Sequence, residues 1–143
     1  MILYLDTSAI VPLLISEPSS ERCGRLWDVS RLRFTARITY VEAAAALAAA
    51  ERSRRIDSDV HAQALAVLDV LWSQVQIVEL DDSLMKDAAA IAHEAGLRGY
   101  DAVHCASAMR LARLDPVGVS GDRALLEAWR NHGVDVADAN SQA

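Results

Sequence analysis

Short apolar runs alternate along the whole chain with longer stretches of helical periodicity. Residues 2–5, Ile-Leu-Tyr-Leu, form a continuous apolar run, which is typical of a strand buried on both faces of a parallel sheet. Further short runs follow, and between them apolar residues recur three and four positions apart, as in an amphipathic helix. We expect strands at residues 2–5, 33–36, 76–80, 116–119 and 133–136. We expect helices at residues 9–15, 18–29, 39–53, 58–73, 82–95, 101–113 and 122–131.

This alternation determines the predicted fold class. Strands that alternate with helices, without a tight hairpin between two strands, predict a parallel α/β sheet with helices on both faces. A chain of 143 residues has the length of one domain and can bury a substantial core. We therefore expect a single domain over residues 1–137, followed by a loose polar tail at residues 138–143.

Four acidic residues lie where a strand-like run ends or a helix begins. They are Asp6, Glu42, Asp101 and Asp122. In a parallel α/β fold these points converge on one edge of the sheet, where ligands bind. Four carboxylates at one edge would repel one another and resist ionisation. A hard divalent cation with oxygen ligands removes that conflict, so the acids point to a magnesium or manganese site.

Each of these acids also has a purely structural explanation. Asp6, Asp101 and Asp122 can cap the helices that follow them through a carboxylate oxygen. Thr39 and Glu42 fit the capping-box pattern, in which the glutamate satisfies a free backbone N–H. A cap explains any one acid taken alone, whereas the set at separate strand–helix junctions favours the metal site.

Other polar residues near these acids have two interpretations. Ser8 and Ser120 can orient a carboxylate or hold a metal-bound water, and turn and cap roles explain them equally well. His104, one turn after Asp101, can be a base or a metal ligand, but pairing with Asp101 or filling space is the favoured interpretation. Cys105 fits a core position better than a nucleophile, because no His–Asp pattern accompanies it.

Other chemistries fit the sequence less well. Asp81 and Asp82 stand at the same kind of junction, and we interpret them as helix caps. The chain has no G-x-G-x-x-G or G-x-x-x-x-G-K-[ST] phosphate loop and no G-x-S-x-G elbow. It also has no cysteine–histidine cluster with zinc-ligand spacing.

Composition and charge narrow the possible classes of protein. The net charge of -6 argues against a protein that coats nucleic acid by bulk charge, but not against a nucleic-acid enzyme with clustered acids. Thirteen arginines accompany one lysine, a bias that suits phosphate contact but is better explained by codon composition. No apolar stretch approaches the ~20 residues of a membrane helix, and no basic leader precedes Asp6. Cys23 and Cys105 are expected to be reduced thiols in a cytoplasmic protein.

Several short motifs occur in the order that is typical of one known family. Tyr-Leu-Asp-Thr-Ser-Ala spans residues 4–9, Glu-Pro follows at 17–18, and Thr-x-Val-Glu spans 39–42. Arg-Gly-Tyr-Asp-Ala-Val-His spans residues 98–104, and Val-Ser-x-Asp spans 119–122. This ordered set covers nearly the whole chain and resembles the PIN-domain family. Within that family it is similar to the VapC-type toxins of bacterial type II toxin–antitoxin pairs.

The resemblance implies a three-layer α/β/α fold and a magnesium- or manganese-dependent endoribonuclease. It further implies a homodimer that is held inactive by a small antitoxin, which binds DNA through its N-terminal part and blocks the site with its C-terminal part. The acids that match the family's catalytic and metal-binding positions are Asp6, Glu42, Asp101 and Asp122. The residues that match its supporting polar positions are Ser8 and Ser120.

The expected reaction is hydrolysis of an RNA phosphodiester bond by a metal-activated water. Asp6, Asp101 and Asp122 are expected to hold the ion, directly or through water, and Glu42 to act as a further ligand or as the base. Single-stranded or looped RNA is the favoured substrate. The alternatives are a catalytically inactive PIN-like binding module and a metal-dependent DNA nuclease.

Two apolar regions are candidate surfaces for a protein partner. One is the helix of small residues that begins at Ala43. The other comprises Val11, Leu13, Leu14 and Trp27. Each of these residues can equally belong to the core.

Overall fold

A five-stranded parallel sheet forms the centre of the protein, in a computed structural model that describes residues 1–142. The strand order is β3-β2-β1-β4-β5. β1 (Ile2–Leu5) lies in the middle, between β2 (Leu32–Ala36) and β4 (Val117–Ser120). β3 (Gln76–Val78) and β5 (Asp135–Asp138) form the two edges. All four neighbouring pairs are parallel, as predicted.

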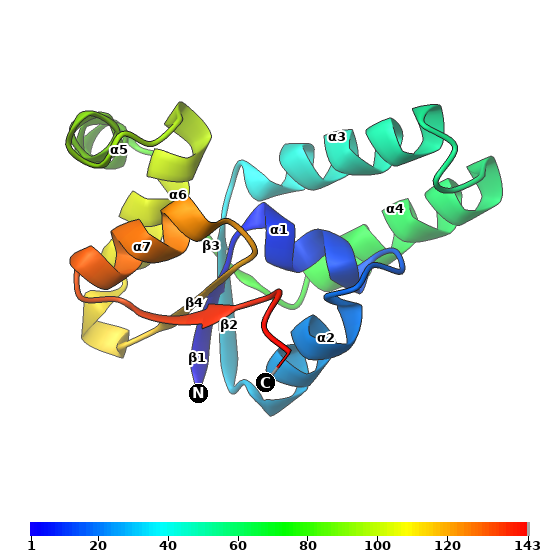
Figure 1. The fold of residues 1–143 in the computed structure, drawn as a ribbon, viewed down its shortest axis with the longest axis horizontal. Coiled ribbons are helices and arrows are strands. Elements are labelled where there is room, and N and C mark those ends of the chain that lie inside the picture. Colours follow the sequence, from blue (N-terminus) through cyan, green and yellow to red (C-terminus); the bar gives the residue numbers. More distant parts are fainter. Residues whose placement is uncertain (143) are drawn as a thin grey trace.

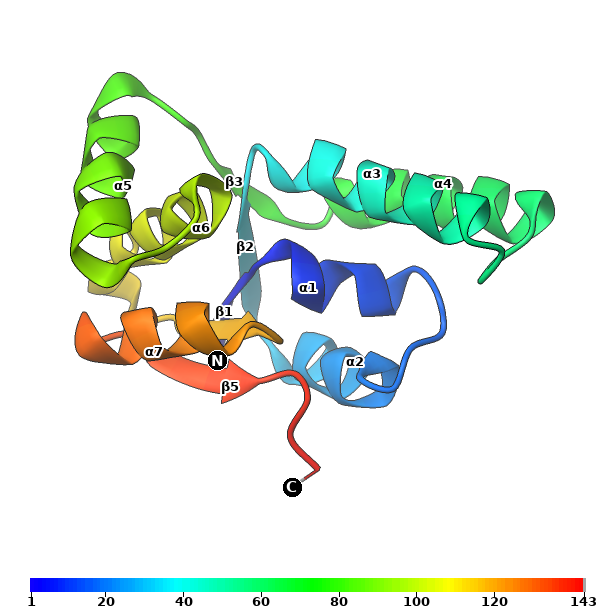
Figure 2. The ribbon, with the colours of Figure 1, turned by 45° about the horizontal axis from the view of Figure 1, so that its top comes forward.

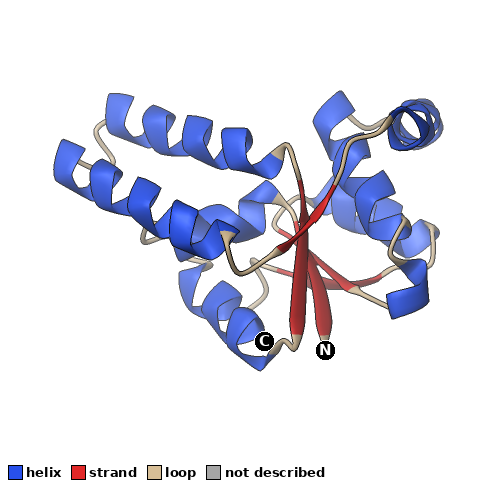
Figure 3. Cartoon of the chain, turned by 180° about the vertical axis from the view of Figure 1, so that it is seen from behind, coloured by secondary structure: helices blue, strands red, loops and turns tan. Residues whose placement is uncertain are grey.

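Helices cover both faces of this sheet (Figure 3). One face is covered by α1 (Thr7–Ile10), α2 (Ser20–Val29), α3 (Thr39–Arg52) and α4 (Ser58–Trp72). The other face is covered by α5 (Asp82–Ala95), α6 (Gly99–Met109) and α7 (Arg123–Asn131). Figure 1 shows the two groups of helices on opposite sides of the strands. The predicted three-layer α/β/α architecture is confirmed.

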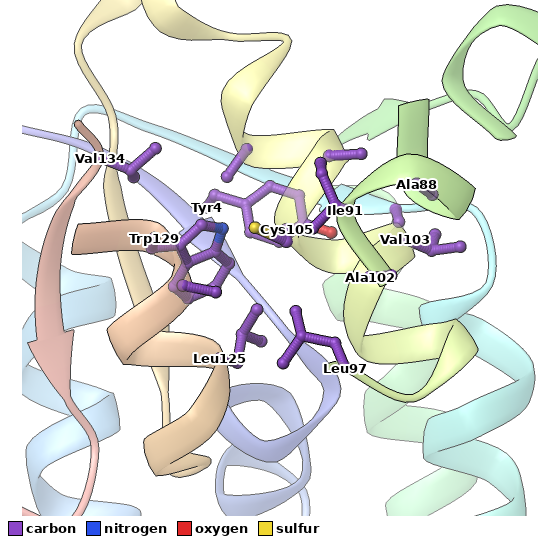
Figure 4. Packing of buried hydrophobic residues seen from close by; sticks show 14 of the residues in the cluster. Tyr4, Ala88, Ile91, Leu97, Ala102, Val103, Cys105, Leu125, Trp129 and Val134 are labelled. Atoms are coloured by element: carbon purple, nitrogen blue, oxygen red, sulfur yellow. The ribbon is translucent and has the colours of Figure 1, made fainter. Parts of the chain in front are cut away.

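Side chains of β1 divide the hydrophobic core into two clusters. Leu3 and Leu5 belong to the cluster under α1 to α4, whereas Tyr4 belongs to the cluster under α5 to α7. Successive side chains of a strand point to opposite faces, so a strand in the middle layer must be apolar at every position. Figure 4 shows Tyr4 among Trp129, Cys105 and Ile91 in the second cluster.

The first predicted helix is shorter than expected. The α-helical part ends at Ile10, and a 3₁₀ helix, η1, follows over Val11–Leu13. Pro12 has no backbone N–H and cannot continue the i→i−4 hydrogen-bond pattern, which explains the change of helix type. The second helix begins at Ser20 instead of at residue 18. Before it, Ser20 Oγ closes a turn by accepting from the Glu17 N–H and donating to the Ile15 carbonyl.

The helix predicted at residues 101–113 is displaced towards the N-terminus. α6 starts at Gly99 and ends at Met109, and a second 3₁₀ helix, η2, covers Ala112–Leu114. Asp101 therefore lies in the first turn of α6, and the residue at the N-cap is Arg98. The helices at 58–73 and 82–95 agree with prediction to within one residue.

The last strand and the expected tail differ from the prediction. Gly133 has a left-handed backbone, with φ of 80°, and belongs to the turn after α7, so β5 starts two residues later than expected and ends at Asp138. Ala139 is buried, and its N–H donates to the Ser120 carbonyl. Asn140 Nδ2 donates to the Gly121 carbonyl. Residues 138–140 of the predicted tail at 138–143 thus brace the end of β4, and residue 143 lies outside the described residues.

The expected partner surfaces are partly core. On α3 the residues Ala43, Leu47 and Ala50 are buried, and α3 and α4 lie together as a pair that extends away from the sheet (Figure 2). Leu13 and Trp27 line a groove of about 260 Å³ beside α4. No helix within residues 1–142 has the length and apolar character needed to cross a membrane.

Candidate functional site

The carboxyl ends of the parallel strands bring the predicted site residues to one edge of the sheet. The β1–α1, β2–α3 and β4–α7 connections all leave from this edge (Figure 1). Asp6 follows β1 directly, Glu42 lies in the first turn of α3, and Asp122 follows β4. This is the position at which α/β folds bind ligands.

Asp6 is buried and held on both carboxylate oxygens. Ser8 Oγ donates to Oδ1 at 2.7 Å, and Ser120 Oγ donates to Oδ2 at 2.7 Å. The Ala9 N–H also donates to Oδ1, so Asp6 caps α1 as well. The two serine oxygens lie 3.3 Å apart. Ser8 and Ser120 therefore orient this carboxylate from two different elements, α1 and β4.

Ser120 links Asp6 to Asp122. The Asp122 N–H donates to Ser120 Oγ at 2.9 Å, and Asp122 Oδ1 caps α7 by accepting from the Leu125 N–H. The other oxygen, Oδ2, lies 3.9 Å from Arg98 Nη2. Arg98 Nε lies 3.4 Å from Asp101 Oδ2, so one guanidinium group lies against both acids.

Glu42 joins the site from the opposite side through a network of polar side chains. Its Oε1 accepts from Thr7 Oγ1 at 2.7 Å and lies 2.8 Å from His104 Nε2. The other ring nitrogen of His104, Nδ1, lies 2.7 Å from the Tyr4 hydroxyl. His104 is almost completely buried, at 2% exposure, and it interacts electrostatically with both Asp6 and Asp101.

The environment changes the pKa values of these acids in opposite directions. Burial raises the pKa of Asp6, against the opposing effects of His104 and the two serines. Burial, followed by the charge of Asp122, raises the pKa of Asp101. Burial alone would also raise the pKa of Glu42, but the hydrogen bonds from His104 and Thr7 lower it. Two of the acids thus resist ionisation, which is the conflict that a bound cation would relieve.

The chemistry of the side chains suits a hard cation. All four acids supply oxygen, and Mg²⁺ binds through one or two carboxylates while it keeps several waters. Within residues 1–142 no three His, Cys, Asp or Glu side chains form a group already close enough to hold an ion. The residues therefore fit an ion bound partly through water better than a closed cage of protein ligands.

Two structural expectations for the acids were wrong. Glu42 does not complete a capping box with Thr39, because α3 has no side-chain cap and Glu42 accepts from Thr7 and His104 instead. Asp101 is not the N-cap of α6. His104 does not pair with Asp101 at hydrogen-bond distance but bonds Glu42, 62 residues away in the chain.

Tyr4, Thr7 and Arg98 also belong to the site, and the sequence did not predict this. Arg98 precedes Asp101 by three residues, and this spacing places the two side chains on one side of a helix start, so it could have been found. The contact between Tyr4 and His104 joins residues 100 positions apart, and nothing in the local sequence indicates it.

Comparison with known proteins identifies the family. The PIN domain model matches residues 3–113. The chain belongs to the PIN-domain family. The matched region contains Asp6, Glu42 and Asp101 and ends before Ser120 and Asp122. The chain is 35% identical over 138 residues to Ribonuclease VapC45 and to Ribonuclease VapC49 from two Mycobacterium tuberculosis strains, covering 96% of each protein and of this chain. It is therefore a PIN-domain protein of the VapC type.

Solved structures share the fold. PAE2754 from Pyrobaculum aerophilum aligns with a TM-score of 0.67 at 25% identity, over 94% of this chain and 83% of that one. FitAB bound to an IR36 DNA fragment aligns with a TM-score of 0.68 at 18% identity, over 100% of this chain and 98% of that one. VapBC2 from Rickettsia felis, bound to a promoter DNA fragment, aligns with a TM-score of 0.65 at 12% identity, over 96% and 98%.

Proposed function

We propose that this protein is a Mg²⁺- or Mn²⁺-dependent endoribonuclease and the toxin of a toxin–antitoxin pair. The relatives that match 96% of the chain are named ribonucleases. The observation that carries the proposal is the site itself, where Asp6 is held by Ser8 and Ser120 beside Asp122 at the carboxyl edge of the sheet. This arrangement fixes one carboxylate and links it through Ser120 to a second, which supports a phosphodiesterase site.

Each site residue has a role in this proposal. A bound Mg²⁺ or Mn²⁺ would supply an activated water and offset the charge that builds on the phosphoryl oxygens. Asp6, Asp101 and Asp122 would hold the ion, in part through water. Glu42 would either bind it as well or accept a proton from the attacking water. Arg98, whose side chain is 70% exposed, lies where it can contact a phosphate of the RNA.

A cleavage assay with Asp6→Asn tests this function. We expect the wild type to cut single-stranded or looped RNA with Mg²⁺ or Mn²⁺ and to stop when EDTA is added. Asp6→Asn should keep the fold and lower kcat by about 100-fold, the factor that corresponds to ~2.7 kcal/mol of lost transition-state stabilisation.

Asp82→Asn is the matched control for that assay. Asp82 is exposed in the first turn of α5. Its neighbour Asp81 pairs with Arg110, which follows the C-terminal end of α6, whereas Asp101 lies in the first turn of that helix. This variant should cut at the wild-type rate. Wild-type cleavage by Asp6→Asn would remove Asp6 from the chemistry. Absence of any metal-dependent cleavage would favour the inactive binding module, and preference for single-stranded DNA would favour the DNA nuclease.

An antitoxin partner and a homodimer belong to the same proposal. The chain shares its fold with solved toxin–antitoxin complexes, among them one from Klebsiella pneumoniae at a TM-score of 0.65, 14% identity and 96% coverage of this chain. Leu13, Trp27, Val67 and Val70 line the groove between α2 and α4, and the two valines are exposed. An apolar segment of the antitoxin would bury these side chains. Light scattering during size-exclusion chromatography, with and without the antitoxin, measures both assemblies.

A further inference from the structure

A buried row of three side chains leads from the core to the site. Tyr4 and His104 have almost no exposure, and Glu42 stands at the edge of the site with a side chain that is 21% exposed. The row contains two short contacts, from the Tyr4 hydroxyl to His104 Nδ1 at 2.7 Å and from His104 Nε2 to Glu42 Oε1 at 2.8 Å. A buried polar group without a hydrogen-bond partner costs free energy. The Tyr4 hydroxyl therefore needs His104 as its partner, and His104 needs Glu42.

The direction of the second hydrogen bond follows from its acceptor. An ionised carboxylate can only accept, so His104 Nε2 carries a hydrogen and donates it to Glu42 Oε1. The other ring nitrogen, Nδ1, lies 2.7 Å from the Tyr4 hydroxyl, which can donate to a bare nitrogen or accept from an N–H. In either case the contact with Tyr4 fixes the orientation of the ring, with Nε2 towards Glu42.

The two oxygens of Glu42 are used differently. Oε1 accepts from Thr7 as well as from His104, whereas Oε2 has no hydrogen bond within residues 1–142. A glutamate side chain has three rotatable bonds and loses considerable conformational entropy when it is fixed. Two donors on one oxygen fix the carboxylate and leave the other oxygen free to take part in the chemistry of the site.

We propose that Tyr4 and His104 are positioning residues that hold Glu42 for the reaction. Both are buried and act through Glu42, because they hold its carboxylate by Oε1 and leave Oε2 without a donor among the described residues. This inference rests on the proposed function, because it assigns a role within the same site. Partners that orient a metal-site ligand in other proteins change metal affinity or activity by about 10- to 100-fold when they are removed.

The test uses a double-mutant cycle with a conservative rescue. Tyr4→Phe removes only the hydroxyl and keeps the ring against Trp129, whose centroid lies 5.8 Å away. His104→Leu removes the donor to Glu42, and His104→Gln returns an N–H donor close to the position of Nε2. We expect His104→Leu to lower kcat about tenfold with little change in the KM for RNA, and His104→Gln to recover part of that loss.

Coupling between the residues separates positioning from mere packing. Tyr4→Phe should lower kcat alone and have no further effect in the His104→Leu background. If Glu42 binds the ion, the variants that lower kcat should also bind Mn²⁺ more weakly. The dissociation constant, measured by calorimetry without RNA, should then rise most in the variant with the largest loss of kcat. If kcat alone changes, Glu42 acts on the water, and the positioning role stands. Unchanged kcat and Mn²⁺ affinity in all three variants, or additive effects of Tyr4→Phe and His104→Leu, would overturn the proposal.

Ile91→Val is the control for loss of packing. Ile91 belongs to the same core cluster as Tyr4, so this variant should lower Tm but leave kcat and Mn²⁺ affinity unchanged. The wild type separates failure of the proposed function from failure of the positioning role. A wild type that cuts no RNA contradicts the proposed function, and the Mn²⁺ titrations still decide whether Tyr4 and His104 position Glu42. A wild type that cuts RNA, with variants like the control, contradicts only the positioning role.

Discussion

At the scale of single residues, Arg98 shows how a charged side chain can belong to a site without stabilising the fold. Its guanidinium lies 3.4 Å from Asp101 and 3.9 Å from Asp122, and it also lies over the Tyr100 ring. An ion pair this exposed contributes little to stability. In the proposed function, its positive charge would compete with a metal ion for these acids and could contact a phosphate of the RNA.

Replacement of Arg98 should therefore have two effects of opposite sign. In Arg98→Gln, Mn²⁺ should bind more tightly, because no cation competes for Asp101 and Asp122. The KM for RNA should rise about fivefold, the equivalent of roughly 1 kcal/mol, because a phosphate contact is lost. Calorimetric titration with Mn²⁺ and steady-state cleavage kinetics measure the two quantities separately.

Arg110→Gln is the control for loss of an arginine. Arg110 caps the other end of α6 and pairs with Asp81 and Asp87. We expect neither Mn²⁺ affinity nor the KM for RNA to change in this variant. Changes in the same direction for both variants would mean that net charge, and not the position of Arg98, determines the effect.

At the scale of elements, the contact between β4 and α7 fixes the second core cluster. A Cβ atom at Gly118 would lie 2.6 to 2.9 Å from three ring atoms of Trp129. Trp129 is fully buried and meets Tyr4 edge-on, at an interplanar angle of 78°. The absence of a side chain at Gly118 thus lets α7 approach the sheet and holds the indole ring against Tyr4.

Gly118→Ala should destabilise the protein, since the rigid indole cannot move without disturbing Tyr4. Overpacking of this kind costs about 1–3 kcal/mol, and urea denaturation measures it. Gly24→Ala is the matched control. Gly24 lies inside α2, with no atom within 4 Å of an added Cβ, so this change should increase the free energy of unfolding by about 0.5–1 kcal/mol. Equal effects of the two substitutions would contradict this account of the β4–α7 contact.

The spacing of apolar residues in the sequence predicted the strands and helices well. β1 is apolar at every position because it is buried on both faces, and the amphipathic helices show helical spacing of their apolar residues. Their ends were less predictable. The change of helix type at Pro12 and the late start of β5 after Gly133 depend on hydrogen bonds that the apolar pattern does not encode. The acids could be predicted from their place at strand–helix junctions. The Tyr4–His104 contact could not, because it exists only once α6 packs on β1.

At the scale of the whole molecule, the three layers gather charge that the fold does not neutralise. The sheet directs the ends of β1 and β4 and the starts of α3 and α6 to one edge. Arg98 and His104 offset part of the charge there, and the buried Asp6 has no ion-pair partner within residues 1–142. Catalytic sites commonly reduce stability in this way. The resulting strain should be visible as a dependence of stability on pH and on metal.

The sign of the pH dependence follows from the shifted pKa values. The pKa values of Asp6 and Asp101 are raised, so the folded protein keeps protons that the unfolded chain, with an aspartate pKa of about 3.9, has already lost. The metal-free protein therefore loses stability as the pH rises from the aspartate pKa of the unfolded chain through the raised pKa values of Asp6 and Asp101 in the folded protein. The lowered pKa of Glu42 acts oppositely, because its contribution is present above the unfolded pKa and is lost as the pH falls through the lowered value.

Mn²⁺ should reverse the effect of Asp6 and Asp101, because an ion binds the deprotonated carboxylates. At 100 times its dissociation constant an ion that binds only the folded state stabilises it by about 2.7 kcal/mol. The difference in Tm with and without Mn²⁺ should be largest near neutral pH. It should disappear as acid protonates Asp6 and Asp101, and because their pKa values are raised, this should happen at a higher pH than for an aspartate with an ordinary pKa. Differential scanning fluorimetry across this range measures both curves. In Asp6→Asn the curves should nearly coincide at every pH, whereas a constant separation in the wild type would place the ion away from these acids.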